Sequence, residues 1–116
     1  MAILGVNLIK HHVSDWPAAI AFYRDALGLK PLFEVPGLWA QFEAPDGGRI
    51  GLVMEHEGIR RPPHAVLKVD DLAATMAALS AGGAKFLAGP QTTDYGVTVL
   101  LRDPSGNTVE LIEAGR

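Results

Sequence analysis

Hydrophobic and polar residues alternate along most of the chain in short runs that are bounded by glycine, proline, asparagine or aspartate. Such runs are typical of β-strands, because successive side chains of a strand point to opposite faces of the sheet. The pattern predicts strands at 4–13, 29–35, 38–43, 49–55, 64–69, 85–87, 97–102 and 107–113. It predicts an irregular loop over 89–96.

Two stretches carry the three- to four-residue periodicity of an amphipathic helix. They begin at Asp15 and Asp71, whose carboxylates are suited to cap the first N–H groups of a helix. They end at Gly28 and at Gly82, where glycine commonly terminates a helix. The predicted apolar stripes are Trp16, Ile20, Tyr23 and Leu27 in the first helix and Leu72, Thr75, Met76 and Leu79 in the second.

The second half of the chain repeats the first half. Residues 62–85 follow the order of residues 6–30 at a spacing of 56 residues, with a strand, a capping aspartate, an Ala-rich helix and a closing glycine. Residues 101–114 match residues 42–55 at a spacing of 59 residues, with proline and glycine in the same places of the turn. Self-similarity at a fixed period indicates a duplicated unit of about fifty-five residues: a strand, a helix and three strands.

We therefore expect one α+β domain over 1–116, with module one at 1–56, a linker at 57–63 and module two at 64–116. A four-stranded sheet with one helix on a single face leaves its other face in need of cover. Two such βαβββ modules, paired into a cup-shaped sheet, would enclose a shared cavity.

Composition narrows the possible functions. A net charge of −3 gives no electrostatic reason to expect nucleic acid or an anionic membrane as a partner. The chain has no cysteine, which excludes disulfides, thiolate metal sites and a cysteine nucleophile. No apolar run approaches the ~20 residues of a membrane span, and 1–5 is too short for a signal peptide. The expected location is the cytoplasm.

Several short sequence motifs resemble those of the vicinal oxygen chelate superfamily, the group of glyoxalases, bleomycin resistance proteins and extradiol dioxygenases. They are Val13-Ser14-Asp15, the AFYRDALGL segment at 21–29, VDDL at 69–72, and DPSGN at 103–107 followed by VEL at 109–111. The resemblance implies a paired βαβββ fold, usually in a homodimer. It also implies a ligand held in a cup between two modules of the same or different chains.

In relatives that use a metal, the resemblance places the ligands in the first and last strands of each module, here at Leu8, Gly51, His64 and Glu110. The repeat pairs the same positions, since Leu8 stands opposite His64 and Gly51 opposite Glu110. Leucine and glycine supply no side-chain donor, and stable sites normally have three or more protein ligands. The expected cofactor is therefore none, or a weakly bound divalent ion such as manganese, iron, nickel or zinc.

His64 and Glu110 leave three interpretations open. They could hold a weak metal, or form a buried hydrogen-bonded pair. They could also act without metal, since a carboxylate that accepts a proton from an imidazole poises it for general acid–base chemistry. His12 shares a strand face with Leu8, but it lies about 13 Å farther along the strand, too far to serve as a third ligand.

The remaining ligand-binding candidates line or cover the expected cup: Leu8, Lys10, His12, Trp39, Gly51 and Tyr95. Lys10 and His12 could hold a carboxylate or phosphate, or form a solvated strand end. Trp39 could stack on a flat ligand, or belong to the core or a dimer interface. Tyr95 could orient a carbonyl from a loop over the ligand, or lie on the surface.

The leading functional hypothesis is a homodimer that binds and sequesters a small, partly apolar molecule, such as a toxic natural product, as bleomycin resistance proteins do in antibiotic resistance. The alternative is a metal-dependent lyase, isomerase or dioxygenase that uses His64 and Glu110. A third hypothesis is a scaffold that binds a protein partner and leaves the cup empty.

Overall fold

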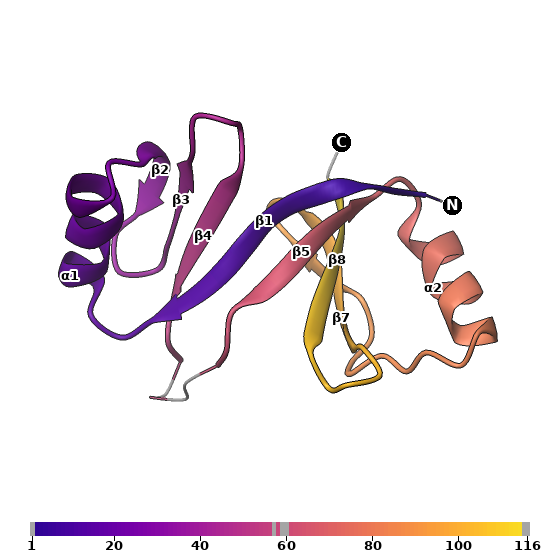
Figure 1. The fold of residues 1–116 in the computed structure, drawn as a ribbon. Coiled ribbons are helices and arrows are strands. Elements are labelled where there is room, and N and C mark those ends of the chain that lie inside the picture. Colours follow the sequence, from indigo (N-terminus) through magenta and orange to yellow (C-terminus); the bar gives the residue numbers. More distant parts are fainter. Residues whose placement is uncertain (1, 57, 59–60, 115–116) are drawn as a thin grey trace. The chain divides into compact units, whose positions relative to one another are not determined.

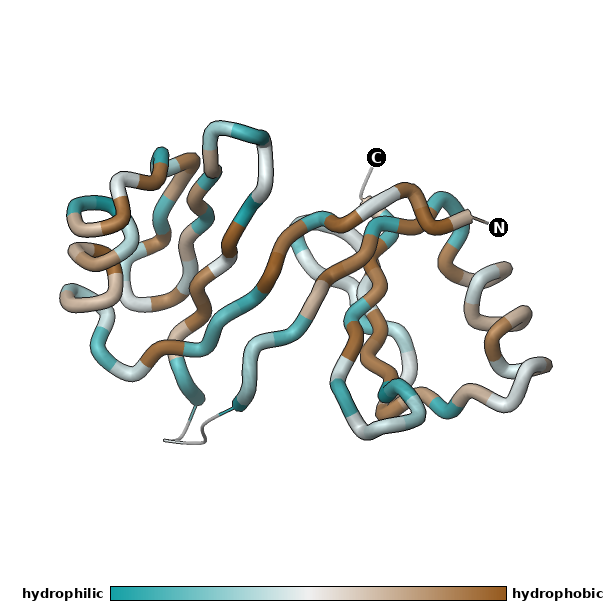
Figure 2. Tube along the Cα trace, viewed as in Figure 1, coloured by the Kyte–Doolittle hydropathy of each residue, from teal (hydrophilic) through white to brown (hydrophobic). Residues whose placement is uncertain are grey.

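The computed structural model describes residues 2–56, 58 and 61–114. The chain forms two compact units, one over Leu8–Pro63 and the other over Met1–Asn7 together with His64–Arg116. Each unit contains the strand, helix and three further strands that the repeat predicts, which confirms the α+β class and the two βαβββ modules (Figure 1). We call them module one and module two. The apolar stretches of the trace coincide largely with strands, and the turns between them are more polar (Figure 2).

Module one is built on the strand order β2-β3-β4-β1. The strand β1 runs parallel to β4, whereas β3 is antiparallel to both of its neighbours. The elements are β1 Ile3–Val13, α1 Trp16–Ile20, η1 Ala21–Ala26, β2 Lys30–Val35, β3 Trp39–Glu43 and β4 Arg49–Met54. The first five residues of β1, 3–7, belong to the other unit.

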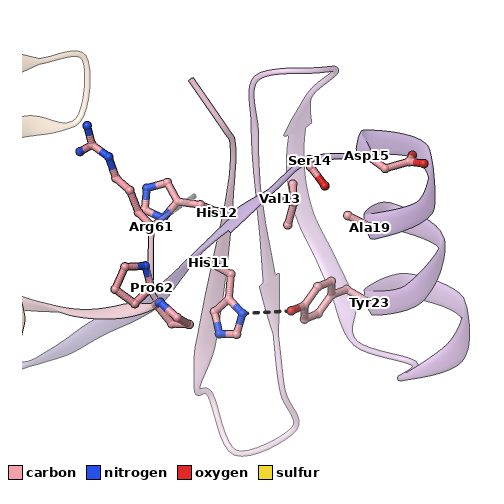
Figure 3. A pocket seen from close by; sticks show the side chains of 10 residues that line it. His11, His12, Val13, Ser14, Asp15, Ala19, Tyr23, Arg61 and Pro62 are labelled. Carbon is pink, nitrogen blue, oxygen red and sulfur yellow. Dashed lines mark hydrogen bonds between the residues drawn. The ribbon is translucent and has the colours of Figure 1, made fainter. Parts of the chain in front are cut away.

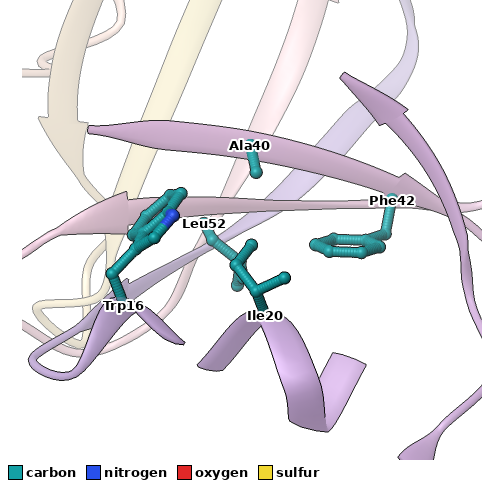
Figure 4. Packing of buried hydrophobic residues seen from close by; sticks show 5 residues of the cluster. All are labelled: Trp16, Ile20, Ala40, Phe42 and Leu52. Carbon is teal, nitrogen blue, oxygen red and sulfur yellow. The ribbon is translucent and has the colours of Figure 1, made fainter. Parts of the chain in front are cut away.

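The helix of module one begins as predicted. Asp15 Oδ1 accepts a hydrogen bond from the Ala18 N–H at 3.0 Å, and Pro17 occupies the first turn. Trp16 and Ile20 pack into a core cluster with Ala40, Phe42 and Leu52 (Figure 4). The Trp16 indole N–H donates to Glu34 Oε2 at 2.8 Å, so its polar edge is satisfied inside this core.

The last turns of this helix differ from the prediction. In η1 the hydrogen bonds reach five residues back, as in the bond from Leu27 N–H to the Phe22 carbonyl at 2.9 Å. A wider turn uses more residues per revolution, which rotates the following side chain away from the stripe. Leu27 is consequently 52% exposed, and its assignment to the buried stripe was wrong.

Module two repeats this arrangement with the strand order β5-β8-β7-β6 and parallel pairing of β5 with β8. Its elements are β5 His64–Val69, α2 Leu72–Ala81, β6 Gln91–Thr93, β7 Gly96–Arg102 and β8 Thr108–Ala114. Asp71 caps α2 through a bond from the Ala74 N–H, and Glu113 accepts from the Leu72 N–H. Its core cluster is Val69, Leu72, Val99, Leu101 and Leu111.

Two predictions about the second strand of module two, which follows its helix, were wrong. Residues 85–87 form no strand; Phe86 makes a single bridge with Leu101 and packs against the core. The strand β6 forms instead inside the predicted loop, pairing with β7. All three of its residues are polar and exposed, so the apolar pattern that marks the other strands is missing there. Within the described ranges, no helix is long and apolar enough to cross a membrane.

The strand register confirms the repeat residue by residue. Lys10 pairs with Gly51 across β1 and β4, and Val66 pairs with Glu110 across β5 and β8. These two pairs are related by the same spacings of 56 and 59 residues that the sequence shows. The positions of Leu8 and His64, and those of Gly51 and Glu110, are therefore structurally equivalent in the two modules.

Candidate functional site

His64 and Glu110 form a buried polar pair in module two. His64 is the first residue of β5, and Glu110 lies in the middle of β8, two positions out of register, so that both side chains reach the same face. Glu110 Oε1 accepts a hydrogen bond from His64 Nε2 at 2.8 Å. The two side chains are only 8% and 9% exposed. The structure thus brings together the two polar residues that the sequence singled out for a metal or for acid–base chemistry.

The donor set of this pair is too small for a tightly held metal. Structural and catalytic sites normally use three or more protein ligands, and the two donor atoms here are hydrogen-bonded to each other at 2.8 Å. In the part of the chain that the structure describes, no group of three or more histidine, cysteine, aspartate or glutamate side chains is arranged to hold an ion. His64 and Glu110 would have to separate and gain donors from outside this pair.

The equivalent place in module one is filled by hydrocarbon. Leu8 is 2% exposed, and a Cβ built on Gly51 would lie 3.2 and 3.3 Å from its two Cδ atoms. The same Cβ would lie 3.6 Å from Cζ3 of Trp39. Phe33 stands edge-on to Trp39, with ring centroids 5.1 Å apart. Leu8, Gly51 and Trp39, three of the predicted ligand-binding residues, are therefore in one cluster.

The two modules compensate in side-chain size at these positions. Trp39 in β3 corresponds to Thr98 in β7, because Trp39 pairs with Val53 and Thr98 pairs with Ile112. Module one thus combines a large aromatic residue with Gly51, and module two combines a small residue with Glu110. The indole occupies part of the space into which a longer side chain at position 51 would extend.

The other predicted ligand-binding residues are spread more widely. Lys10 is half-buried and lies beside Gly51 in the register of β1 and β4. His12 is half-buried two residues farther along β1 and lines a separate pocket. Tyr95 is half exposed in the turn between β6 and β7, where its N–H donates to Thr93 Oγ1 at 3.2 Å. A cup shared by these residues stays a prediction.

A pocket of about 700 Å³ in module one was missed from the sequence (Figure 3). Its polar lining includes His11 and Tyr23, whose Nδ1 and hydroxyl oxygen are 3.1 Å apart and joined by a hydrogen bond. The sequence had assigned Tyr23 to the helical core stripe, and it had no reason to pair that residue with a strand histidine. Among the predicted ligand-binding residues, only His12 lines this pocket.

Burial changes the acid–base properties of the His11–Tyr23 pair. Desolvation lowers the pKa of His11 below its ordinary value of 6.5 and raises the pKa of Tyr23 above 10.0. Both shifts favour the uncharged forms at neutral pH. The pair therefore presents a neutral imidazole and a neutral phenol to the pocket.

We expect the protein to lose stability below about pH 6.5 in part because of His11. Since its pKa is lowered in the folded state, the unfolded chain takes up the proton first as the pH falls. The stabilising contribution is complete above the unfolded pKa of about 6.5 and declines until the pH passes the folded pKa. Urea unfolding at pH steps from 8 to 5 should show a flatter curve for His11→Gln than for the unaltered protein. The exposed His56, substituted as His56→Gln, is the control; curves parallel to the unaltered protein for both variants would contradict this expectation.

Comparison with known families gives a match over nearly the whole chain. Residues 5–111 match the model of the Glyoxalase/Bleomycin resistance protein/Dioxygenase superfamily. No curated protein matches the chain.

Solved structures share the fold at low sequence identity. Methylmalonyl-CoA epimerase from Mycobacterium tuberculosis has a TM-score of 0.82 at 21% identity, covering 98% of this chain and 90% of its own. A structure described as NAD-dependent benzaldehyde dehydrogenase from Legionella pneumophila has a TM-score of 0.78 at 20% identity, covering 93% of this chain and 98% of its own. An extradiol ring-cleaving dioxygenase from B. fuscum has a TM-score of 0.72 at 16% identity, covering 98% of this chain and 33% of its own. At these identities the likeness concerns the fold alone.

Proposed function

Because the chain belongs to the glyoxalase/bleomycin resistance protein/dioxygenase superfamily, we propose that it binds and sequesters a small, partly apolar molecule. The observation that carries the proposal is the packing of Leu8 and Trp39 around Gly51. The resemblance implies metal ligands at two of these positions, and module one fills them with hydrocarbon. Such a surface favours contact with an apolar ligand over coordination chemistry.

The aromatic pair Trp39 and Phe33 supports the same proposal. Phe33 is 36% exposed and its ring meets Trp39 edge-on, so that aromatic surface of the cluster remains open to a flat ligand. Lys10, next to Gly51 in the register, would add a positive charge to this apolar surface. In this proposal Lys10 and Trp39 contact the ligand, and Leu8, which is 2% exposed, supports this surface from the core. We assign the ligand to the class of toxic natural products that includes antibiotics.

The proposal extends to assembly and location. We expect a cytoplasmic homodimer that takes a small molecule, with no role for nucleic acid or membranes. The net charge of −3 supports the exclusion of polyanionic partners. The homodimer is supported by the resemblance to the superfamily.

The second candidate function is a metal-dependent lyase, isomerase or dioxygenase. The convergence of His64 and Glu110 at 2.8 Å in a buried position favours it, because imidazole and carboxylate are both donors that divalent metals accept. Two protein donors are too few for a closed site, so this candidate ranks second.

Metal content separates the two candidates. We expect native mass spectrometry of protein stripped and reloaded with manganese, iron, nickel or zinc to show less than one tightly held equivalent per chain. One equivalent that persists through dialysis and disappears in His64→Ala would favour the enzyme instead. The exposed His56→Ala is the control for nonspecific binding to imidazole.

A thermal-shift screen of natural products tests the sequestration itself. A ligand present at 100 times its Kd should stabilise the protein by about 2.7 kcal/mol. Trp39→Ala should weaken its affinity about tenfold or more, since the aromatic contact surface is lost. Phe22→Ala removes a ring that is 51% exposed outside this cluster and should leave the affinity unchanged. Absence of any ligand across a broad screen would favour a protein-binding scaffold.

A further inference from the structure

The pocket of module one is formed by segments that the fold brings together from three parts of the sequence. The end of β1 and the turn into α1 form one side, with the helix carrying Ala19 and Tyr23 next to them. The stretch 61–63 forms the third part (Figure 3). The volume of about 700 Å³ lies in the range of cavities that hold drug-sized molecules.

The lining combines cationic or hydrogen-bonding groups with apolar surface. Arg61 and His12 can carry positive charge, and Tyr23 and Ser14 contribute hydroxyl groups. The apolar lining consists of Val13, Ala19, Pro62 and Pro63. Such a lining suits a molecule that has an apolar body and one polar end.

From this arrangement we infer that the pocket is a second ligand site, which binds a small organic anion with its carboxylate or phosphate on Arg61. Guanidinium groups bind both kinds of anion through two parallel hydrogen bonds. In the described part of the chain, Arg61 makes no ion pair with a carboxylate, and its side chain is exposed. Figure 3 shows the guanidinium directed outward, and as an exposed side chain it can rotate over the mouth of the pocket to meet the anion. His12, which also lines the pocket, adds an imidazole to the anionic end.

The acidic residue of the lining does not oppose this inference. Asp15 uses Oδ1 to accept from the Ala18 N–H, so its carboxylate is engaged by the start of α1. Figure 3 shows Asp15 at the start of the helix, with Arg61 and His12 drawn on the other side of the pocket. The negative charge is therefore partly offset by the helix N-terminus.

The His11–Tyr23 pair supplies another part of the lining. Its two groups are already hydrogen-bonded to each other, and burial keeps both uncharged. A neutral imidazole and a neutral phenol can each form a hydrogen bond with a hydroxyl or carbonyl group of the ligand. No charged group has to be removed from water for this. The pocket thus distinguishes a charged end at Arg61 from a neutral polar end at Tyr23.

The test uses benzoate, inorganic phosphate and benzyl alcohol as probes in NMR titrations of the full chain. We expect saturable shifts with benzoate at the amides of His11, Tyr23 and Arg61, and about tenfold weaker binding of benzyl alcohol, which lacks the anion. The titration with inorganic phosphate measures whether an anion binds in the pocket without an apolar group attached to it. Arg61→Gln should weaken benzoate about tenfold, and the exposed Arg102→Gln, outside the pocket, should leave its affinity unchanged. Tyr23→Phe keeps the ring and removes the hydroxyl, and should weaken benzoate less than Arg61→Gln.

Equal binding of benzoate and benzyl alcohol, or no saturable shift in this pocket, would overturn the inference. So would an Arg61→Gln variant that keeps full affinity. These outcomes are independent of the sequestration proposal, because Arg61 and Tyr23 lie outside the cluster of Leu8, Gly51 and Trp39. Trp39→Ala should leave benzoate binding in the pocket unchanged.

Discussion

Gly51→Glu is expected to destabilise the protein by about 3 kcal/mol or more. The new Cβ would already lie 3.2 Å from a methyl group of Leu8, and the rest of the side chain would meet the Trp39 ring. Overpacking of this kind costs about 1–3 kcal/mol. A carboxylate buried without a partner adds a further penalty. Replacing a strand glycine also reduces the conformational entropy that the chain loses on folding, but this stabilises the protein by only about 0.5–1 kcal/mol. Urea unfolding of the two proteins measures the difference.

Two further variants separate the causes. Gly89→Glu places the same residue where a Cβ meets nothing within 4 Å, and should change stability by less than about 0.5 kcal/mol. Adding Leu8→His to Gly51→Glu recreates the residue pair of module two, and should recover at least about 1 kcal/mol through coupling of the two side chains. A Gly51→Glu variant as stable as the unaltered protein would show that Leu8 and Trp39 do not close this position.

The sequence predicted most of the fold because the duplication marks the first and last strands of each module twice. Apolar runs locate these strands in module one, and the repeat predicts their counterparts in module two at fixed spacings. The register pairs Lys10 with Gly51 and Val66 with Glu110, as those spacings require. The contact between His64 and Glu110 follows from the same pairing, since strand positions two residues apart share a face.

Features that depend on tertiary packing could not be predicted in this way. The wide turns of η1, which turn Leu27 outward, leave no mark in the apolar periodicity. The strand β6 is polar and exposed, so its pairing with β7 alone defines it. The pocket around His11 and Tyr23 depends on a stretch near position 61 returning to the end of β1, a contact between residues about fifty positions apart.

The contrast between the modules is itself informative about the site. Equivalent positions carry Leu8 and Gly51 in module one and His64 and Glu110 in module two. Trp39 in β3 stands at the position that Thr98 has in β7. One duplicated framework therefore supports an apolar cluster and a polar pair. A binding function requires only the apolar cluster, whereas an enzymatic one requires the polar pair, so the two can be tested independently.

Glu110→Ala is expected to destabilise the protein by about 1–3 kcal/mol, because it leaves the buried His64 N–H without its acceptor. His64→Ala should cost a similar amount for the complementary reason. The double variant should lose less than the sum of the two, with a coupling free energy of about 1–3 kcal/mol, as expected for side chains in direct contact. Urea unfolding of all four proteins at pH 7.5 gives this value.

Glu110→Gln is the matched control, because its amide oxygen can still accept from His64 while the charge is removed. It should lose less stability than Glu110→Ala, by roughly 1 kcal/mol. Coupling near zero would mean that the 2.8 Å contact adds nothing to folding. A strongly coupled pair would instead be held in place by its own hydrogen bond. Any metal would then have to break that bond before it could bind, which explains why we expect weak metal binding at best.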